Sequence, residues 1–185
     1  MHSINKRNLT KLAILLKQKR NIFHTEDLEL LWGITNKHTL YSTLHRYTKN
    51  NYLIPIQRSL YSTLPLNQLN PIELGSALIH QFTYLTTESV LSQAGLIFQD
   101  IPHLTFVSRK VKKFTVNKTS YFCRQLKDEF LFHPAGIIQK TGYKQATSER
   151  AIADLLYFNP KYYFDATAQI NWPSIKKLQK QIGYI

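Results

Sequence analysis

The sequence has little cysteine, little glycine and few acidic residues. Cys123 is the single cysteine among 185 residues, which excludes an internal disulfide and a zinc cage built from several cysteines. No glycine-rich phosphate loop is present, and the seven histidines lack the spacing of a metal site. We therefore expect no metal and no cofactor, and a reducing compartment suits the lone thiol.

Long apolar runs are also missing. A membrane-spanning helix needs about 18 consecutive apolar residues, and no stretch of the chain approaches that length. The N-terminal segment has one short apolar run, residues 12–16, without a small-residue cleavage site behind it. We expect a soluble, cytoplasmic protein that does not contact a membrane.

What the sequence does have is positive charge. It has 24 Lys and Arg residues but only 11 Asp and Glu residues, which gives a formal net charge of +13. Such a balance is explained either by a solvated basic surface or by a polyanionic partner, since clustered cations release counterions from phosphates. Residues 1–66 hold 10 basic and 3 acidic side chains, a difference of +7, and this concentration favours the polyanion.

The stretch 25–64 predicts a helix-turn-helix behind a first helix over residues 8–20. Thr25 has the side chain of an N-cap, and the helix that it opens runs to Trp32 and ends at Gly33. The next helix is capped by Thr35 or Asn36 and ends at Asn50.

This third helix has two contrasting faces. Leu40, Leu44 and Tyr47 follow helical spacing and predict one buried stripe. The opposite side carries cations together with hydroxyl, phenol and imidazole groups: Lys37, His38, Tyr41, Ser42, His45, Arg46 and Lys49. Groups of these kinds contact bases and phosphates in protein–DNA complexes.

Two short extended runs, 52–57 and 60–64, follow the third helix, with Arg58-Ser59 at the tip between them. Pro55 lacks an amide donor and therefore suits an edge strand. Helix, helix-turn-helix and hairpin together predict a winged helix-turn-helix over residues 1–66 that binds double-stranded DNA.

We expect the third helix to enter the major groove and the wing tip to reach a phosphate or the minor groove. The candidate DNA contacts are Lys37, His38, Tyr41, Ser42, Arg46 and Arg58, with further backbone contacts from Lys6, Arg7 and Lys11.

Behind a linker at 67–70, residues 71–185 predict a small α+β domain with a mainly antiparallel sheet. Asn70 and Pro71 open a helix, and Glu73 is placed to complete a capping box. The further expected elements are a helix over 86–94 closed by Gly95, strands at 104–108, 113–117, 120–126 and 136–140, a helix capped by Thr147 or Ser148 that stops at Asn159-Pro160, and a last helix opened by Pro173 or Ser174.

Several strings resemble the AbiEi family of antitoxins and transcriptional regulators from type IV toxin–antitoxin systems. They are LIPIQRSLYSTLP, TYLTTESVLSQAGLI, LTFVSRKVKKFTV and YKQATSERAIADLLYF. The last is similar to a strand followed by a helix that opens with Ala-Ser-Pro-Glu-Lys-Ala in the family; here the proline is missing, and the acid–base pair Glu149-Arg150 is kept. The resemblance implies an α+β regulator that represses its own operon, with a nucleotidyltransferase-like toxin encoded nearby.

Two other functions stay open. One is a protein-interaction module that neutralises a partner without specific DNA binding. The other is a nuclease, which needs acids converging on a lysine, and the strands of the second half are basic and nearly acid-free. We expect no enzyme activity.

Three smaller features of the second half also have two explanations. Cys123 lies in an expected strand and is interpreted as a buried structural residue rather than a nucleophile. Glu149 is expected to serve the start of its helix or to pair near Arg150. An aromatic group predicts either core packing or a patch for a protein partner: Tyr157, Phe158, Tyr162, Tyr163 and Phe164.

Overall fold

The computed structural model describes the backbone of residues 6–185 and the side chains from residue 11 onward. The chain is an α+β protein that divides into two compact units, Met1–Ala77 and Leu78–Ile185. The division falls within helix α4 (Pro71–Ile79), and a short 3-10 helix (Leu66–Gln68) occupies part of the linker expected at 67–70. Each unit is described by itself.

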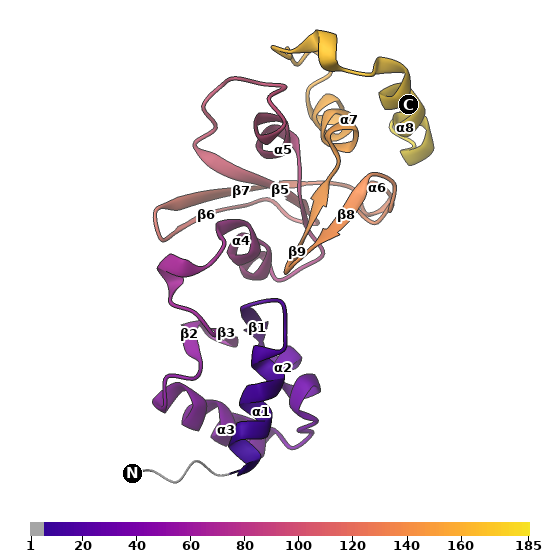
Figure 1. Cartoon of the computed structure of the whole chain (residues 1–185). Helices are drawn as coiled ribbons and strands as arrows, with labels where there is room; N and C mark the ends of the chain where they lie inside the picture. The colour runs from indigo at the N-terminus through magenta and orange to yellow at the C-terminus, as the bar shows by residue number, and fades with distance from the viewer. Residues whose placement is uncertain (1–5) are drawn as a thin grey trace. The chain divides into compact units, whose positions relative to one another are not determined.

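In the described part of the first unit, three helices and most of α4 accompany a three-stranded antiparallel sheet (Figure 1). Its elements before α4 are α1 (Lys6–Leu16), β1 (Ile22–His24), α2 (Thr25–Trp32), α3 (Lys37–Lys49), β2 (Ile54–Gln57) and β3 (Leu60–Ser62). The strand order is β1-β3-β2, so Pro55 does lie on an edge strand. Residues 22–24 form a strand that the sequence did not predict, in which Ile22 pairs with Ser62 and His24 with Leu60.

Helix boundaries in this unit follow local capping chemistry. Gly33 ends α2 with φ of 61°, and Asn36 caps α3 by accepting the Thr39 N–H at 3.0 Å. The prediction of Thr25 as an N-cap is wrong. Strand β1 continues through His24, whose N–H donates to Asp27 at 2.8 Å, so Thr25 is already the first residue of α2.

The core of the first unit joins all three helices to the sheet. The predicted stripe of α3 is confirmed, since Leu40, Leu44 and Tyr47 are 0–2% exposed. Buried residues of the other elements complete this core: Leu15, Phe23, Leu28, Trp32, Ile34 and Leu53. Burying side chains of this size contributes about 1.5–3 kcal/mol each, and the stripe thereby fixes which face of α3 is turned outward.

Helix α4 begins as expected, but Glu73 does not cap it. The Asn70 side chain accepts the Ile72 N–H at 2.8 Å. Glu73 is 5% exposed, and its carboxylate accepts the Asn21 N–H at 3.0 Å. The capping-box prediction is therefore wrong: Glu73 ties α4 to the residue before β1.

The second unit is built on a six-stranded mixed sheet with strand order β6-β7-β5-β4-β9-β8 (Figure 1). The pairs β5–β7 and β4–β9 are parallel, and the other three pairs are antiparallel. The strands are β4 (Tyr84–Leu85), β5 (His103–Ser108), β6 (Lys112–Val116), β7 (Thr119–Gln125), β8 (Ile137–Lys140) and β9 (Tyr143–Ala146).

The helices of this unit pack against the sheet and against one another. They are α5 (Thr87–Gln93), α6 (Asp128–Leu131), α7 (Ser148–Phe158) and α8 (Trp172–Ile182). Helix α7 packs against both α5 and α8. The four predicted strands and the helix capped by Thr147 are confirmed, whereas α6 was not predicted. Asn171 caps the last helix, so Pro173 lies inside its first turn rather than opening it.

A buried ion pair lies between α7 and the sheet. Arg150 and Asp154 are both 0% exposed, and Arg150 Nε donates to Asp154 Oδ1 at 2.7 Å. The hydroxyl groups of Tyr84, Thr86 and Tyr184 all donate to the same carboxylate. The partner of Arg150 is therefore Asp154, and not the adjacent Glu149.

The remaining groups of Arg150 are also satisfied. Its guanidinium donates to three backbone carbonyls that follow one another in and after α6: Phe130, His133 and Ala135. A buried arginine whose donors are all occupied holds distant segments together. Arg150 thus acts as a structural clamp on the second unit.

The predicted aromatic group divides between core and surface. Phe164 is 2% exposed, and Tyr157 stacks on Tyr184 with ring centroids 4.8 Å apart. Tyr163 is 71% exposed.

Over the part of the chain that the structure describes, no helix is both long enough and apolar enough to span a membrane.

Candidate nucleic-acid interface

The outward face of α3 gathers the polar side chains singled out in the sequence. His38, Ser42, His45 and Lys49 follow one another at steps of four, three and four residues, so they line a single ridge of the helix. All four side chains are exposed. This ridge lies opposite the buried stripe of Leu40, Leu44 and Tyr47, as two faces of one amphipathic helix must.

Lys37, Tyr41 and Arg46 are exposed on the flanks of this ridge. Tyr41 is 56% exposed, which is high for an aromatic side chain on a helix. Within Lys37–Lys49 there is no acidic residue. The face therefore offers cations and hydrogen-bonding groups without an acid among them.

One of these cations already has a partner. Lys37 Nζ lies 2.6 Å from Glu29 Oε2, which joins the start of α3 to α2. The hydrogen bond to Glu29 is the main reason that the pKa of Lys37 is raised, so the ammonium stays charged. The pair is exposed, and it partly neutralises the charge that Lys37 adds to the face.

Arg46 and Lys49 lie in the last turn of α3, where cations interact favourably with the helix dipole. Both are exposed, and neither forms an ion pair with any acid among the described residues. The charge of the face that is free to meet a polyanion is thus concentrated at the C-terminal end of α3.

The hairpin tip beside this face is tied to α2. The Ser59 carbonyl accepts the Thr25 N–H at 3.0 Å, and Ser59 itself has φ of 62°. Arg58, next to it, is exposed. Burial raises the pKa of Tyr61 in β3, and the nearby Tyr41 phenol adds to this effect, so β3 approaches the first half of α3.

Three cations of α1 are expected to contact the DNA backbone. One of them, Lys11, lies over the Trp32 ring, with its ammonium 5.9 Å from the ring centroid. The side chains of Lys6 and Arg7 lie outside the described residues.

Two members of the ridge, His45 and Lys49, were not among the candidate DNA contacts drawn from the sequence. The signal was present, since both continue the helical spacing from His38 and Ser42. Lys37 and Arg46, which are among those candidates, lie on the flanks of the ridge.

Cys123 has none of the features of a nucleophile. It is 0% exposed, and its thiol donates to the Ser108 hydroxyl at 3.0 Å. Burial raises the pKa of the thiol, which disfavours the reactive thiolate. The structural interpretation of this residue is confirmed.

The geometry of the first unit therefore presents an exposed, acid-free helix face beside a short hairpin. Comparison with known proteins adds no family to this description: neither protein-family models nor curated proteins match the chain.

Proposed function

We propose that the chain is a DNA-binding transcriptional regulator whose first unit is a winged helix-turn-helix. The order of its elements supports this proposal: α1, β1, α2, α3, β2 and β3, with β1 and β2 on either side of β3. In such a domain α3 is the recognition helix and the β2–β3 hairpin is the wing.

The observation that carries the proposal is the contrast between the two faces of α3. One face is buried to 0–2% exposure at Leu40, Leu44 and Tyr47. The other is exposed, has no acid, and ends in Arg46 and Lys49, which form no ion pair with an acid that the structure describes. A helix whose buried face is held by the core and whose exposed face is polar is suited to the major groove. There its cations, imidazoles and hydroxyl groups can contact bases and phosphates.

We further propose that the chain acts as an AbiEi-like antitoxin that represses its own operon, in the way its resemblance to that family implies. The segment YKQATSERAIADLLYF forms strand β9 followed by helix α7, in the order that the resemblance leads one to expect. A nucleotidyltransferase-like product of an adjacent reading frame would be the partner toxin.

The proposal is tested by a mobility shift with the full chain and DNA from upstream of its own reading frame. A duplex of equal length and unrelated sequence is the control, and both are measured at low and at higher salt. The proposal expects a complex with the upstream fragment that survives competition by the control duplex. Equal binding to both fragments would argue against a specific regulator, and no binding at low salt would exclude DNA binding through α3.

A further inference from the structure

We propose that the second unit carries a binding surface for single-stranded nucleic acid, on the face of its sheet formed by β5, β6 and β7. Every residue of this surface lies within 78–185. The proposal is therefore independent of the winged helix in the first unit.

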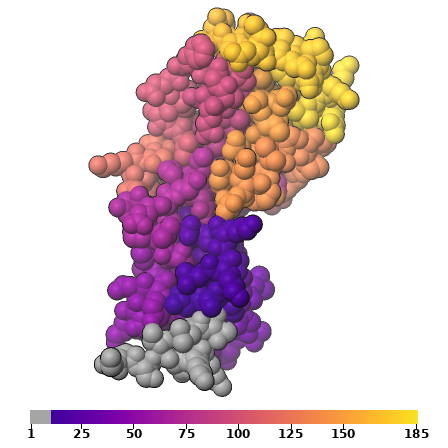
Figure 2. Space-filling model, in the orientation of Figure 1, coloured from indigo at the N-terminus to yellow at the C-terminus, as the bar shows by residue number. Residues whose placement is uncertain are grey.

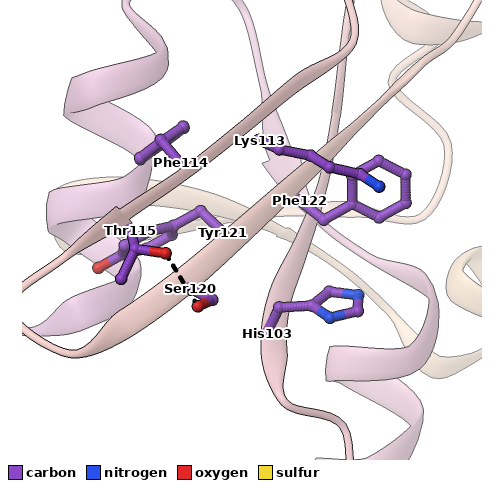
Figure 3. Close-up of a pocket in the computed structure, with 7 residues that line it drawn as sticks. All are labelled: His103, Lys113, Phe114, Thr115, Ser120, Tyr121 and Phe122. Atoms are coloured by element: carbon purple, nitrogen blue, oxygen red, sulfur yellow. Dashed lines mark hydrogen bonds between the residues drawn. The ribbon is translucent and has the colours of Figure 1, made fainter.

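Strand register places five side chains together on one face of this sheet. Lys113 pairs with Phe122, while Ser120 pairs with Thr115 on one side and with His103 on the other. Directly paired residues of neighbouring strands point to the same face. The five side chains line a pocket of about 330 Å³ (Figure 3).

The pocket combines an aromatic ring with a cation. Lys113 Nζ lies 4.7 Å from the centroid of the Phe122 ring, and the lysine side chain reaches across that ring (Figure 3). His103 meets Phe122 edge-on, with ring centroids 5.6 Å apart. An unstacked base can stack on such a ring while the flexible ammonium moves to its phosphate, a combination common in single-strand binding.

Hydroxyl groups supply the polar part of the pocket. The Thr115 and Ser120 hydroxyls are 3.0 Å apart and hydrogen-bonded to each other at the exposed end of the pocket. Each hydroxyl can donate and accept. The pair can therefore contact the edge of a base or the 2′-hydroxyl of a ribose.

The strands that form the pocket carry charge of one sign. Residues 101–127 contain seven Lys and Arg residues and no Asp or Glu. Lys110, Lys113 and Lys118 are exposed and form no ion pair with the described acids, whereas Arg124 is paired with Glu88. The β6–β7 turn, residues 117–118, projects from the second unit in both views (Figure 1, Figure 2). A phosphate chain thus meets free cations along the β6 side of the pocket.

A single strand fits this site better than a duplex. The Phe122 ring is half-buried between its neighbours on the sheet face, so only a base that has left its stack can reach it. Sheet surfaces with aromatic side chains bind single-stranded RNA in this way. RNA and DNA share the base and phosphate chemistry, and they differ at the 2′-hydroxyl.

The test uses the full chain and fluorescence anisotropy with labelled oligo(U) and oligo(dT), each about ten nucleotides long to match a typical single-strand site. We expect both oligonucleotides to bind, and we expect the binding to weaken as salt rises because lysines contact the phosphates. Phe122→Leu should raise Kd by roughly five- to a hundred-fold. Lys113→Gln should lower the slope of log K against log salt by about 0.7. Tighter binding of oligo(U) would identify RNA as the ligand, and tighter binding of oligo(dT) would identify DNA.

Matched controls separate this surface from other effects. Tyr163→Leu changes a 71% exposed aromatic residue outside the pocket, and Lys161→Gln removes an exposed cation there. Both should bind as the unmodified chain does. The proposal is overturned if neither oligonucleotide binds at low salt, or if Phe122→Leu and Lys113→Gln both leave Kd and its salt dependence unchanged.

Discussion

Lys37 Nζ lies 2.6 Å from Glu29 Oε2, so the first cation of α3 is held by the preceding helix. This relationship changes what is expected of Lys37 in DNA binding. A phosphate that approaches Lys37 must share it with Glu29, and the carboxylate repels the same phosphate.

The first prediction follows from this pair. Glu29→Gln should strengthen duplex binding, because it removes a negative charge beside the proposed interface while Lys37 remains. Lys37→Ala should lower the slope of log K against log salt by about one if the lysine holds a phosphate. Anisotropy titrations at several salt concentrations measure both changes. Glu26→Gln is the control, since Glu26 lies exposed on the same helix but accepts no hydrogen bond from Lys37. An equal gain from both variants would mean that only net charge matters.

The second prediction concerns the buried pair of the second unit. Asp154→Ala should lower the free energy of unfolding by about 3–5 kcal/mol, because it leaves the Arg150 guanidinium buried without a counter-charge. Urea unfolding followed by circular dichroism gives the value. Asp128→Ala breaks the exposed pair with Arg109 and should cost at most about 1 kcal/mol. Similar losses for the two variants would contradict the clamp assigned to Arg150.

The third prediction is a pH dependence. Tyr184 donates to Asp154 at 2.5 Å, and burial followed by the charge of Asp154 raises the pKa of its phenol above the usual value. A raised pKa favours the neutral phenol in the folded state. Its stabilisation is therefore complete below the unfolded pKa of about 10 and is lost as pH rises toward the folded pKa.

Tyr184→Phe should consequently cost about 1.5–3 kcal/mol at neutral pH and should make the alkaline fall in stability shallower. Unfolding free energies measured from neutral to alkaline pH test this expectation. Tyr163→Phe, at an exposed tyrosine, is the control. An alkaline fall that is identical in Tyr184→Phe and in the unmodified chain would refute the assignment.

The fourth prediction uses the left-handed backbone at the hairpin tip. Ser59 has φ of 62°, a conformation that costs an L-residue roughly 1–2 kcal/mol and costs glycine little. Ser59→Gly should therefore stabilise the chain by up to about 1 kcal/mol after the extra freedom of the unfolded glycine is subtracted. The same change within α3, Ser42→Gly, should destabilise by about 1 kcal/mol. Thermal and urea unfolding should show opposite signs, and a loss of stability in both variants would contradict the strain at Ser59.

The sequence was sufficient for the elements whose signals are local. The spacing of Leu40, Leu44 and Tyr47 predicts helix α3. Gly33 marks the end of α2, and Asn36 marks the start of α3. Strands β1 and β4 have three and two residues. A strand of two or three residues is too short to show an alternating apolar pattern. These strands form because a strand distant in sequence pairs with them through backbone hydrogen bonds.

Side-chain pairing was the least predictable part. A charged residue such as Arg150 is expected at the surface, and its burial depends on carbonyls and phenols from segments far apart in the chain. Lys37 and Glu29 are eight residues apart, and only the turn between α2 and α3 brings them together. For the same reason, the alignment of Lys113 with Phe122 requires the register of β6 and β7.

The central claim is that the outward face of α3 binds duplex DNA, and one measurement tests it most directly. The Kd for the upstream duplex is determined for the unmodified chain, for Arg46→Ala and for Lys161→Ala, whose lysine is exposed in the second unit. If Arg46 contacts a base, Arg46→Ala should weaken binding by about 1–3 kcal/mol, and Lys161→Ala should leave Kd unchanged. Equal Kd values for all three proteins would contradict the account.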